Sequence, residues 1–290
     1  MLTDRRYREF YGHRRLHDVN AREAAADRVA QTLPRSTAPV PATVQLEADT
    51  LSRDGFVFLP DLVSKAQVDD VLAYCTDLPA HDPYRPELGT FIAPGNVPPV
   101  THVSHYTNQA ILQAPHLLAF ANDPRVLAIV EDSLGAKPTI AALRLWWSTP
   151  TPSGESEHAE NFHRDIDDLR FLKLFVYLTD VDDQSGPHIY ARGSHRKNTL
   201  TQLGRFTDEE VEAAVGADTI LRLKGPAGTS FLESTYGLHR GLPPTHRPRL
   251  VFQPLYTLRP VIFGPKRPVR SARPAEAALD PYVNRVFLRR

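Results

Sequence analysis

From residue 138 onward, the chain consists of short stretches of apolar residues that are separated by glycine, proline and other turn residues. Stretches with the length of a single strand lie at 139–148, 170–179, 187–191, 220–223, 229–233 and 249–258. Short strands at this spacing, with turns between them, are typical of a β-sandwich or a β-barrel. The second half of the chain therefore predicts a β-sheet domain with two layers.

Helices are predicted mainly in the first half of the chain. Residues 4–31 are rich in Arg, Glu and Ala and predict one or two helices, and the proline-containing stretch 34–41 predicts an irregular linker. Ser64 is a suitable N-cap for a helix that runs to Leu78. Further helices are predicted at 46–54 and 124–134, and a strand at 55–60. We expect a mainly β fold with flanking helices, organised as a helical extension with linker (1–45), one domain (46–263) and a basic tail (264–290).

Charge and cysteine content narrow the choice of partners and compartment. Basic and acidic residues balance at 34 each, and an excess of +3 in residues 1–16 and of +5 in residues 264–290 leaves an acidic body. Because no overall field favours nucleic acid, we expect no nucleic-acid partner. Cys75 is the single cysteine, and no apolar run approaches the ~20 residues of a membrane span or resembles a signal peptide. We expect a soluble, cytoplasmic protein with a buried, unreactive thiol.

His163, Asp165 and His239 form the pattern that points most directly to chemistry. His163 and Asp165 are two residues apart, so on an extended strand both side chains point to the same face. His239 would have to come from a distant strand. Two nitrogens and one carboxylate on one face of a metal leave three positions open, which is the arrangement of non-haem Fe(II) oxygenases. These three residues are therefore the predicted metal ligands and catalytic centre.

Several motifs follow Asp165 in a fixed order, and together they are more specific than any one alone. They are the strand 172–178, Thr179-Asp180-Val181, Gly186-Pro187, Gly193-Ser194-His195, His239-Arg240-Gly241 and the Arg-Pro-Arg at 247–249. This order, over residues 50–260, resembles the phytanoyl-CoA dioxygenase (PhyH-like) family of Fe(II)/2-oxoglutarate-dependent dioxygenases. The resemblance implies a double-stranded β-helix, the cupin-like jelly roll. It also implies Fe(II) at His163, Asp165 and His239, with 2-oxoglutarate and O₂ as co-substrates.

The far carboxylate of 2-oxoglutarate needs an anchor inside the barrel. A planar guanidinium binds a carboxylate through two parallel hydrogen bonds, which a lysine cannot do. Arg249 opens an inward-facing strand and is the predicted anchor. Arg247 is the alternative, because the spacing from His239 to Arg249 is about one residue shorter than is usual in the family.

Lys173 shares one strand face with Phe171, Phe175 and Tyr177. An ammonium among aromatic residues needs an anion, which the co-substrate or the substrate could supply. We therefore include Lys173 with the co-substrate residues, and an edge position with the ammonium in water is the alternative.

Candidate substrate residues come from two segments. Arg144 and Trp146 share one face of the strand at 139–148 and would suit an anionic or planar substrate, although core packing is an equal alternative for Trp146. Residues 79–109 hold prolines, histidines and aromatics without a period, which is typical of an active-site lid. In that lid, His102, His105 and Tyr106 are the expected substrate contacts.

We expect a dioxygenase that hydroxylates an unactivated C–H bond of a small organic molecule. Asp165 favours hydroxylation over halogenation, because related halogenases replace this carboxylate by a small residue. Arg164 stands where the family often has glutamine, and this departure could alter the rim of the site. The alternative is a catalytically silent, cupin-like protein that binds a metal or a small molecule. Apolar positions at 282–287 leave docking on the body or on a second copy in a homo-oligomer open.

Overall fold

The computed structural model describes residues 4–36, 41–152, 154 and 156–289. Residues 37–40 of the predicted linker, and residues 1–3 and 290 of the basic ends, lie outside this description. No helix in the described ranges is long and apolar enough to cross a membrane.

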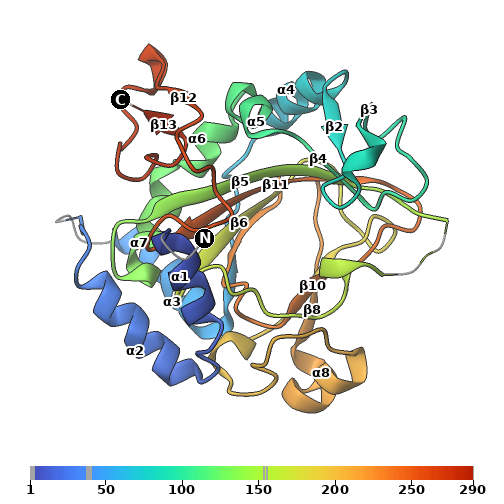
Figure 1. Ribbon diagram of the computed structural model, residues 1–290. Coiled ribbons are helices and arrows are strands. Elements are labelled where there is room, and N and C mark those ends of the chain that lie inside the picture. Colours follow the sequence, from blue (N-terminus) through green and yellow to red (C-terminus); the bar gives the residue numbers. More distant parts are fainter. Residues whose placement is uncertain (1–3, 37–40, 153, 155, 290) are drawn as a thin grey trace.

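Two β-sheets face one another and form a double-stranded β-helix, which confirms the predicted jelly roll (Figure 1). The large sheet has the order β1-β9-β6-β11-β5-β4-β2-β3, and the small sheet has the order β10-β7-β8. The large sheet contains β1 (Phe56–Phe58), β2 (Pro79–His81), β3 (Thr90–Ile92), β4 (Val103–His105), β5 (Thr139–Ser148), β6 (Phe171–Tyr177), β9 (Ser230–Glu233) and β11 (Arg249–Thr257). The small sheet contains β7 (His188–Ala191), β8 (Ile220–Leu223) and β10 (His239–Gly241).

Most of the helices pack outside the large sheet. They are α1 (Arg5–His13), α2 (Val19–Ala30), α3 (Ala42–Asp54), α4 (Lys65–Cys75), α5 (Asn108–Gln113), α6 (Leu117–Ala121), α7 (Pro124–Leu134) and α8 (Asp208–Val215). Short 3₁₀ turns lie at η1 (Pro86–Leu88), η2 (His158–Glu160), η3 (Ser194–Arg196), η4 (Ala217–Thr219) and η5 (Pro274–Glu276). Ser64 caps α4 in a capping box with Gln67, as predicted. Gly55 ends α3 in the left-handed region, where an added Cβ would collide with the Tyr190 hydroxyl.

Strict alternation along β6 separates the core from the barrel interior. Leu172, Leu174 and Val176 pack into the main hydrophobic core, together with residues of α3, α4 and α7. Lys173 and Tyr177, on the opposite face, line a cavity between the two sheets. This phase agrees with the alternation that the sequence predicts for this strand.

The prediction that residues 79–109 are wholly irregular is wrong, because the segment contains three short strands that extend the large sheet. Its role as a lid stays a prediction. β4 pairs with β5, so that His105 lies opposite Trp146, and β2 pairs with β3 and β4. Each strand is three residues long, which is too short for alternation to be visible in a sequence. The hydrogen bonds that define these strands come from partners elsewhere in the chain. Strand β10, which was not predicted from the sequence either, is also three residues long and is therefore too short to show alternation.

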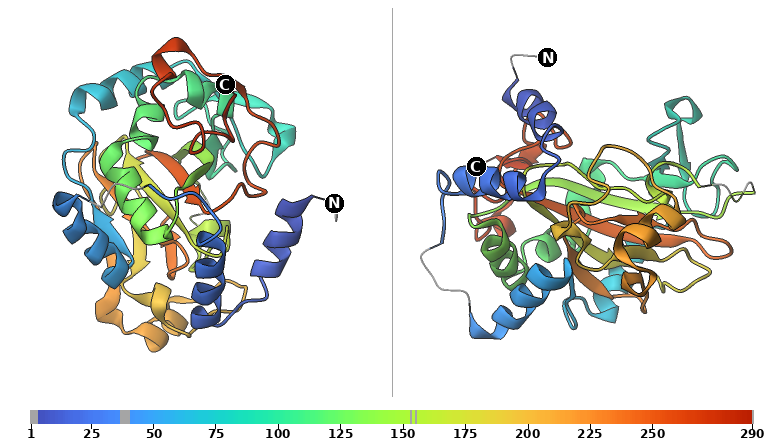
Figure 2. Two further views of the ribbon diagram at one scale, coloured as in Figure 1. Left: turned by 90° about the vertical axis from the view of Figure 1, so that its left-hand side faces the viewer. Right: turned by 90° about the horizontal axis from the view of Figure 1, so that it is seen from below.

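The N- and C-terminal segments both pack on the body of the protein. Figure 2 shows α1 and α2, in dark blue, along the outside of the barrel, and the C-terminal segment, in red, beside the helices drawn in green. Val283, Val286 and Phe287 are buried in the main core, although turns rather than a regular helix carry them. The short strands β12 (Arg270–Ser271) and β13 (Leu288–Arg289) pair with each other.

Arg164, between the two predicted ligands, points away from the metal face and is almost fully buried. Its guanidinium donates to the backbone carbonyls of Tyr236 at 2.6 Å and of Ser194 at 2.9 Å. It also donates to the carbonyls of Lys197, Thr199 and Leu200. The expectation that this residue alters the rim of the site is therefore wrong. Arg164 joins the loop after β7 to the segment that leads into β10.

Replacing Arg164 by Met should destabilise the protein, because buried carbonyl groups would lose a charged donor. The expected cost is about 3 kcal/mol, which corresponds to a fall in Tm of roughly 6–12 °C. Arg164→Lys should recover part of the loss, since an ammonium keeps the charge and three donors. Thermal unfolding followed by circular dichroism measures the effect. The exposed Arg222 supplies the control, Arg222→Met, and an equal Tm for both Met variants would contradict this role.

Candidate active site

Backbone pairing between two distant segments brings His163, Asp165 and His239 together. The amide of His163 donates to the carbonyl of His239 at 3.0 Å, and the reverse bond is 3.1 Å long. The Asp165 amide donates to the Thr235 carbonyl at 2.9 Å. One potential ligand atom from each of the three side chains lies within 4.8 Å of the others, so the three residues could hold a metal ion.

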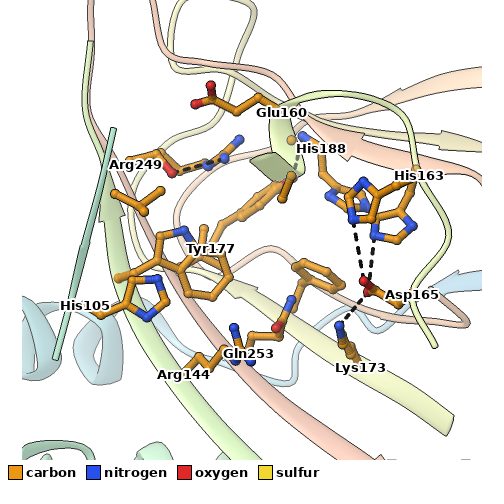
Figure 3. A pocket seen from close by; sticks show the side chains of 18 of the residues that line it. His105, Arg144, Glu160, His163, Asp165, Lys173, Tyr177, His188, Arg249 and Gln253 are labelled. Carbon is orange, nitrogen blue, oxygen red and sulfur yellow. Dashed lines mark hydrogen bonds and ion pairs between the residues drawn. The ribbon is translucent and has the colours of Figure 1, made fainter. Parts of the chain in front are cut away.

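Hydrogen bonds orient both imidazole rings toward the shared carboxylate. Nδ1 of His163 lies 2.8 Å from the Asn161 carbonyl, and Nδ1 of His239 lies 2.9 Å from the Gly237 carbonyl. A carbonyl can only accept, so each Nδ1 carries the proton and each Nε2 offers a lone pair. The Nε2 atoms lie 3.5 Å and 3.4 Å from the Asp165 carboxylate oxygens (Figure 3). Burial also lowers the pKa of His239, which keeps that ring neutral.

Lys173 is paired with carboxylates of the protein rather than with water. Its Nζ lies 2.6 Å from Asp165 and 2.9 Å from Asp167. Burial alone would raise the pKa of Asp165, but Lys173 and His239 hold that pKa well below its usual range. The anion that the sequence requires for Lys173 is therefore present in the protein itself. Lys173 keeps Asp165 ionised, which a carboxylate must be in order to bind a metal ion.

Arg249 and Arg247 occupy different environments. Arg247 is exposed and forms an ion pair with Asp182. Arg249 is buried and lines the cavity from the first position of β11, opposite Ser148 of β5. Its Nη2 lies 3.4 Å from the Ser148 hydroxyl, while its Nε and Nη1 atoms are buried without a partner in the described part of the chain. A buried guanidinium with two unpaired donor atoms fits a ligand carboxylate.

The cavity has a volume of about 180 Å³ and contains most, but not all, of the predicted site residues. Those that line it are His163, Asp165, His239, Lys173, Arg249, Arg144, Trp146 and His105. His102 does not line it, because its Nδ1 pairs with Glu160 at 3.0 Å. Tyr106 does not line it either, because its hydroxyl accepts a 3.0 Å bond from Trp147 in the core. His105 and Tyr106 are adjacent on an extended segment, so only one of them can face inward.

Several residues that line the cavity were not predicted from the sequence as site residues. Gln253 follows Arg249 by four positions on β11, so its inward direction could have been read from the strand alternation. His188 lies beside His239, with ring centroids 5.5 Å apart, and its Nε2 contacts the buried Glu233 at 2.9 Å. Burial lowers the pKa of His188 to about 3 and raises that of Glu233 to about 8. A neutral imidazole therefore supports the ring of His239.

Comparison with known protein families identifies the family of this chain. The family described as phytanoyl-CoA dioxygenase (PhyH) matches residues 51–243, about two thirds of the chain. The chain belongs to this family. PhyH proteins use Fe(II), 2-oxoglutarate and O₂, and the orienting hydrogen bonds of the histidines and the unpaired guanidinium fit these groups.

Solved structures share the fold at low sequence identity. EctD from S. alaskensis with bound Fe is 21% identical, with a TM-score of 0.55 over 89% of this chain and 94% of that chain. The alpha-ketoglutarate-dependent epimerase SnoN from nogalamycin biosynthesis is 20% identical, with a TM-score of 0.51 over 75% and 81%. HygX from Streptomyces hygroscopicus, with nickel and 2-oxoglutarate, is 17% identical, with a TM-score of 0.50 over 86% and 97%. No curated protein matches the sequence.

Replacing any one of His163, Asp165 and His239 by alanine should weaken metal binding, because three ligands define the site. Changing an outer-shell partner of a ligand typically costs 10–100-fold, so we expect a loss on the order of 100-fold or more for a ligand itself. Isothermal titration with Mn(II) measures this without turnover. His246→Ala, at an exposed histidine, should bind as the unchanged protein does. Unchanged affinity in Asp165→Ala would remove that residue from the ligand set.

Proposed function

We propose that this protein is an Fe(II)- and 2-oxoglutarate-dependent dioxygenase that hydroxylates an unactivated C–H bond of a small organic molecule. One observation carries the proposal. A His-x-Asp…His cluster and a buried arginine with two unpaired donor atoms line the same cavity. The first could hold iron and the second a carboxylate, which are the two requirements of this chemistry.

Each residue has a distinct role in the proposed site. His163, Asp165 and His239 would hold Fe(II), and the Arg249 guanidinium would bind the far carboxylate of 2-oxoglutarate beside the Ser148 hydroxyl. When bound, Fe(II) and 2-oxoglutarate supply the oxidative decarboxylation that activates O₂. The protein provides orientation and a cavity whose aromatic lining, including Phe175 and Tyr177, limits the access of water.

The outcome of the oxidation is the finer part of the proposal. Asp165 keeps a carboxylate at the position where a halogenase would need an open site for chloride, and this favours hydroxylation. The fold also serves an epimerase, SnoN, so the fold alone does not select the outcome. Incorporation of one oxygen atom is the distinguishing measurement. Incubation of the loaded enzyme with a metabolite extract under ¹⁸O₂ should give a product heavier by one ¹⁸O atom.

Decarboxylation of 2-oxoglutarate separates the proposed enzyme from a silent binding protein. We expect Fe(II)-dependent formation of succinate, and we expect a chelator or the Asp165→Ala variant to abolish it. A cupin-like binding protein would bind 2-oxoglutarate in a calorimeter but form no succinate under any substrate mixture. That result would refute the proposed function.

Replacing Arg249 by Lys should raise the KM for 2-oxoglutarate. The charge is retained but the two-pronged hydrogen bonding is lost, at a cost of about 1.5–3 kcal/mol, or on the order of tenfold to 150-fold. Arg247→Lys is a matched control at an exposed position two residues away. Succinate formation at varied 2-oxoglutarate concentration gives both values. A larger effect of Arg247→Lys would transfer the anchoring role to Arg247.

A further inference from the structure

Besides Arg249 and Lys173, the cavity is lined by a third cationic group, which the binding of iron and 2-oxoglutarate does not require. Arg144 of β5 lines the cavity, and Gln253 of β11 lies directly across the strand pair from it. In the part of the chain that the structure describes, neither side chain forms a hydrogen bond or an ion pair. Gln253 is only 8% exposed. A buried amide without a protein partner indicates a bound water or a ligand, because leaving it unpaired is costly.

Aromatic rings lie beside this polar pair. Trp146 is two residues from Arg144 on the same face of β5, and His105 of β4 lies opposite it. The two rings are stacked, with centroids 5.8 Å apart and planes at 15°. Burial, together with the charge of Arg144, lowers the pKa of His105 to about 3, so this imidazole is neutral. Arg144 therefore supplies the positive charge here, next to a flat and largely apolar wall.

Arg144 and Arg249 lie too far apart along the sheet to serve the same carboxylate. Arg249 is opposite Ser148, and Arg144 is four residues before Ser148 on β5, which corresponds to roughly 13 Å of strand. Figure 3 shows the two arginines on different sides of the cavity, with Arg144 next to Gln253. Lys173, the other cation of the cavity, is already paired with Asp165 and Asp167. The charge of Arg144 is the one without a counter-ion at this end.

We propose that the primary substrate is a small molecule with a carboxylate group, which Arg144 and Gln253 bind. A planar or ring-shaped apolar body of the substrate lies against Trp146 and His105. One guanidinium offers two parallel donors, which match the two oxygens of a carboxylate, and the Gln253 amide adds one more donor. The inference rests on the proposed function. It requires that a substrate whose carboxylate is bound by Arg144 and Gln253 can extend to the cluster of His163, Asp165 and His239.

Paired acids and amides test the proposal through binding alone. The probes are indole-3-acetate with indole-3-acetamide and cyclohexylacetate with cyclohexylacetamide, titrated calorimetrically into protein loaded with Mn(II) and 2-oxoglutarate. We expect each acid to bind more tightly than its amide. Arg144→Gln should weaken binding of the acids by about tenfold to 150-fold, as for a lost charge-assisted hydrogen bond, and change amide binding little. Arg222→Gln, at an exposed arginine outside the cavity, should behave as the unchanged protein.

The readouts separate this proposal from the proposed function. Arg144 is exposed and unpaired, so Arg144→Gln should keep the same melting temperature and the same affinity for 2-oxoglutarate. Equal binding of acids and amides, or full retention of acid binding in Arg144→Gln, would overturn the proposal. Tighter binding of phenyl phosphate than of the acids would overturn the choice of a carboxylate. Failure to form succinate, with acid selectivity intact, would refute the oxygenase and leave the anion site standing.

Discussion

The antiparallel pairing between the segment that carries His163 and strand β10 is the contact on which the site depends. Two reciprocal backbone hydrogen bonds join His163 to His239, and a third holds Asp165 to Thr235. These bonds join two segments that are separated by 75 residues between His163 and His239, including β6, β7, β8 and β9. Without them, the two imidazoles and the carboxylate would have no common geometry. Arg164 also stabilises this arrangement. Its guanidinium donates to the Tyr236 carbonyl in the segment before β10 and to the Ser194 carbonyl in the loop after β7.

Alternation along the strands gives the large sheet an outer face that packs against the helices and an inner face that lines the cavity. On β6 the outward residues complete the hydrophobic core under the helices, and the inward residues include Lys173 and Tyr177. On β5 and β11 the same alternation places Arg144, Trp146, Arg249 and Gln253 inside. A shift of one residue in strand register would move the core residues into the cavity and the cavity residues into the core. The packing of the core therefore also fixes which side chains line the site.

Some charged side chains that line the cavity are paired with a group of opposite charge, and others are not. Lys173 pairs with Asp165 and Asp167, and Glu160 is occupied by His102 and the backbone of Glu157. The guanidinium groups of Arg249 and Arg144 have no counter-ion among the described residues. The unpaired donors of Arg249 are buried, which is costly, so an anion that the protein binds best explains them. Arg144 is exposed, and an anion there is proposed from its place in the cavity beside the buried Gln253. The positions of the two arginines therefore suggest two carboxylates, one from the co-substrate and one from the substrate.

The sequence by itself determined the jelly roll, the long strands and the inward phase of Lys173, Arg144 and Arg249, because each follows from local alternation or from ordered motifs. The Ser64 cap is equally local. Tertiary structure alone decided the strands within 79–109, the core position of Tyr106, the pairing of Lys173 with Asp165, and the exposure of Arg247 against the burial of Arg249. Strands of three residues carry no visible period, and partners from distant segments leave no local signal. These features depend on which parts of the chain meet, and that is set by the packing of the whole barrel.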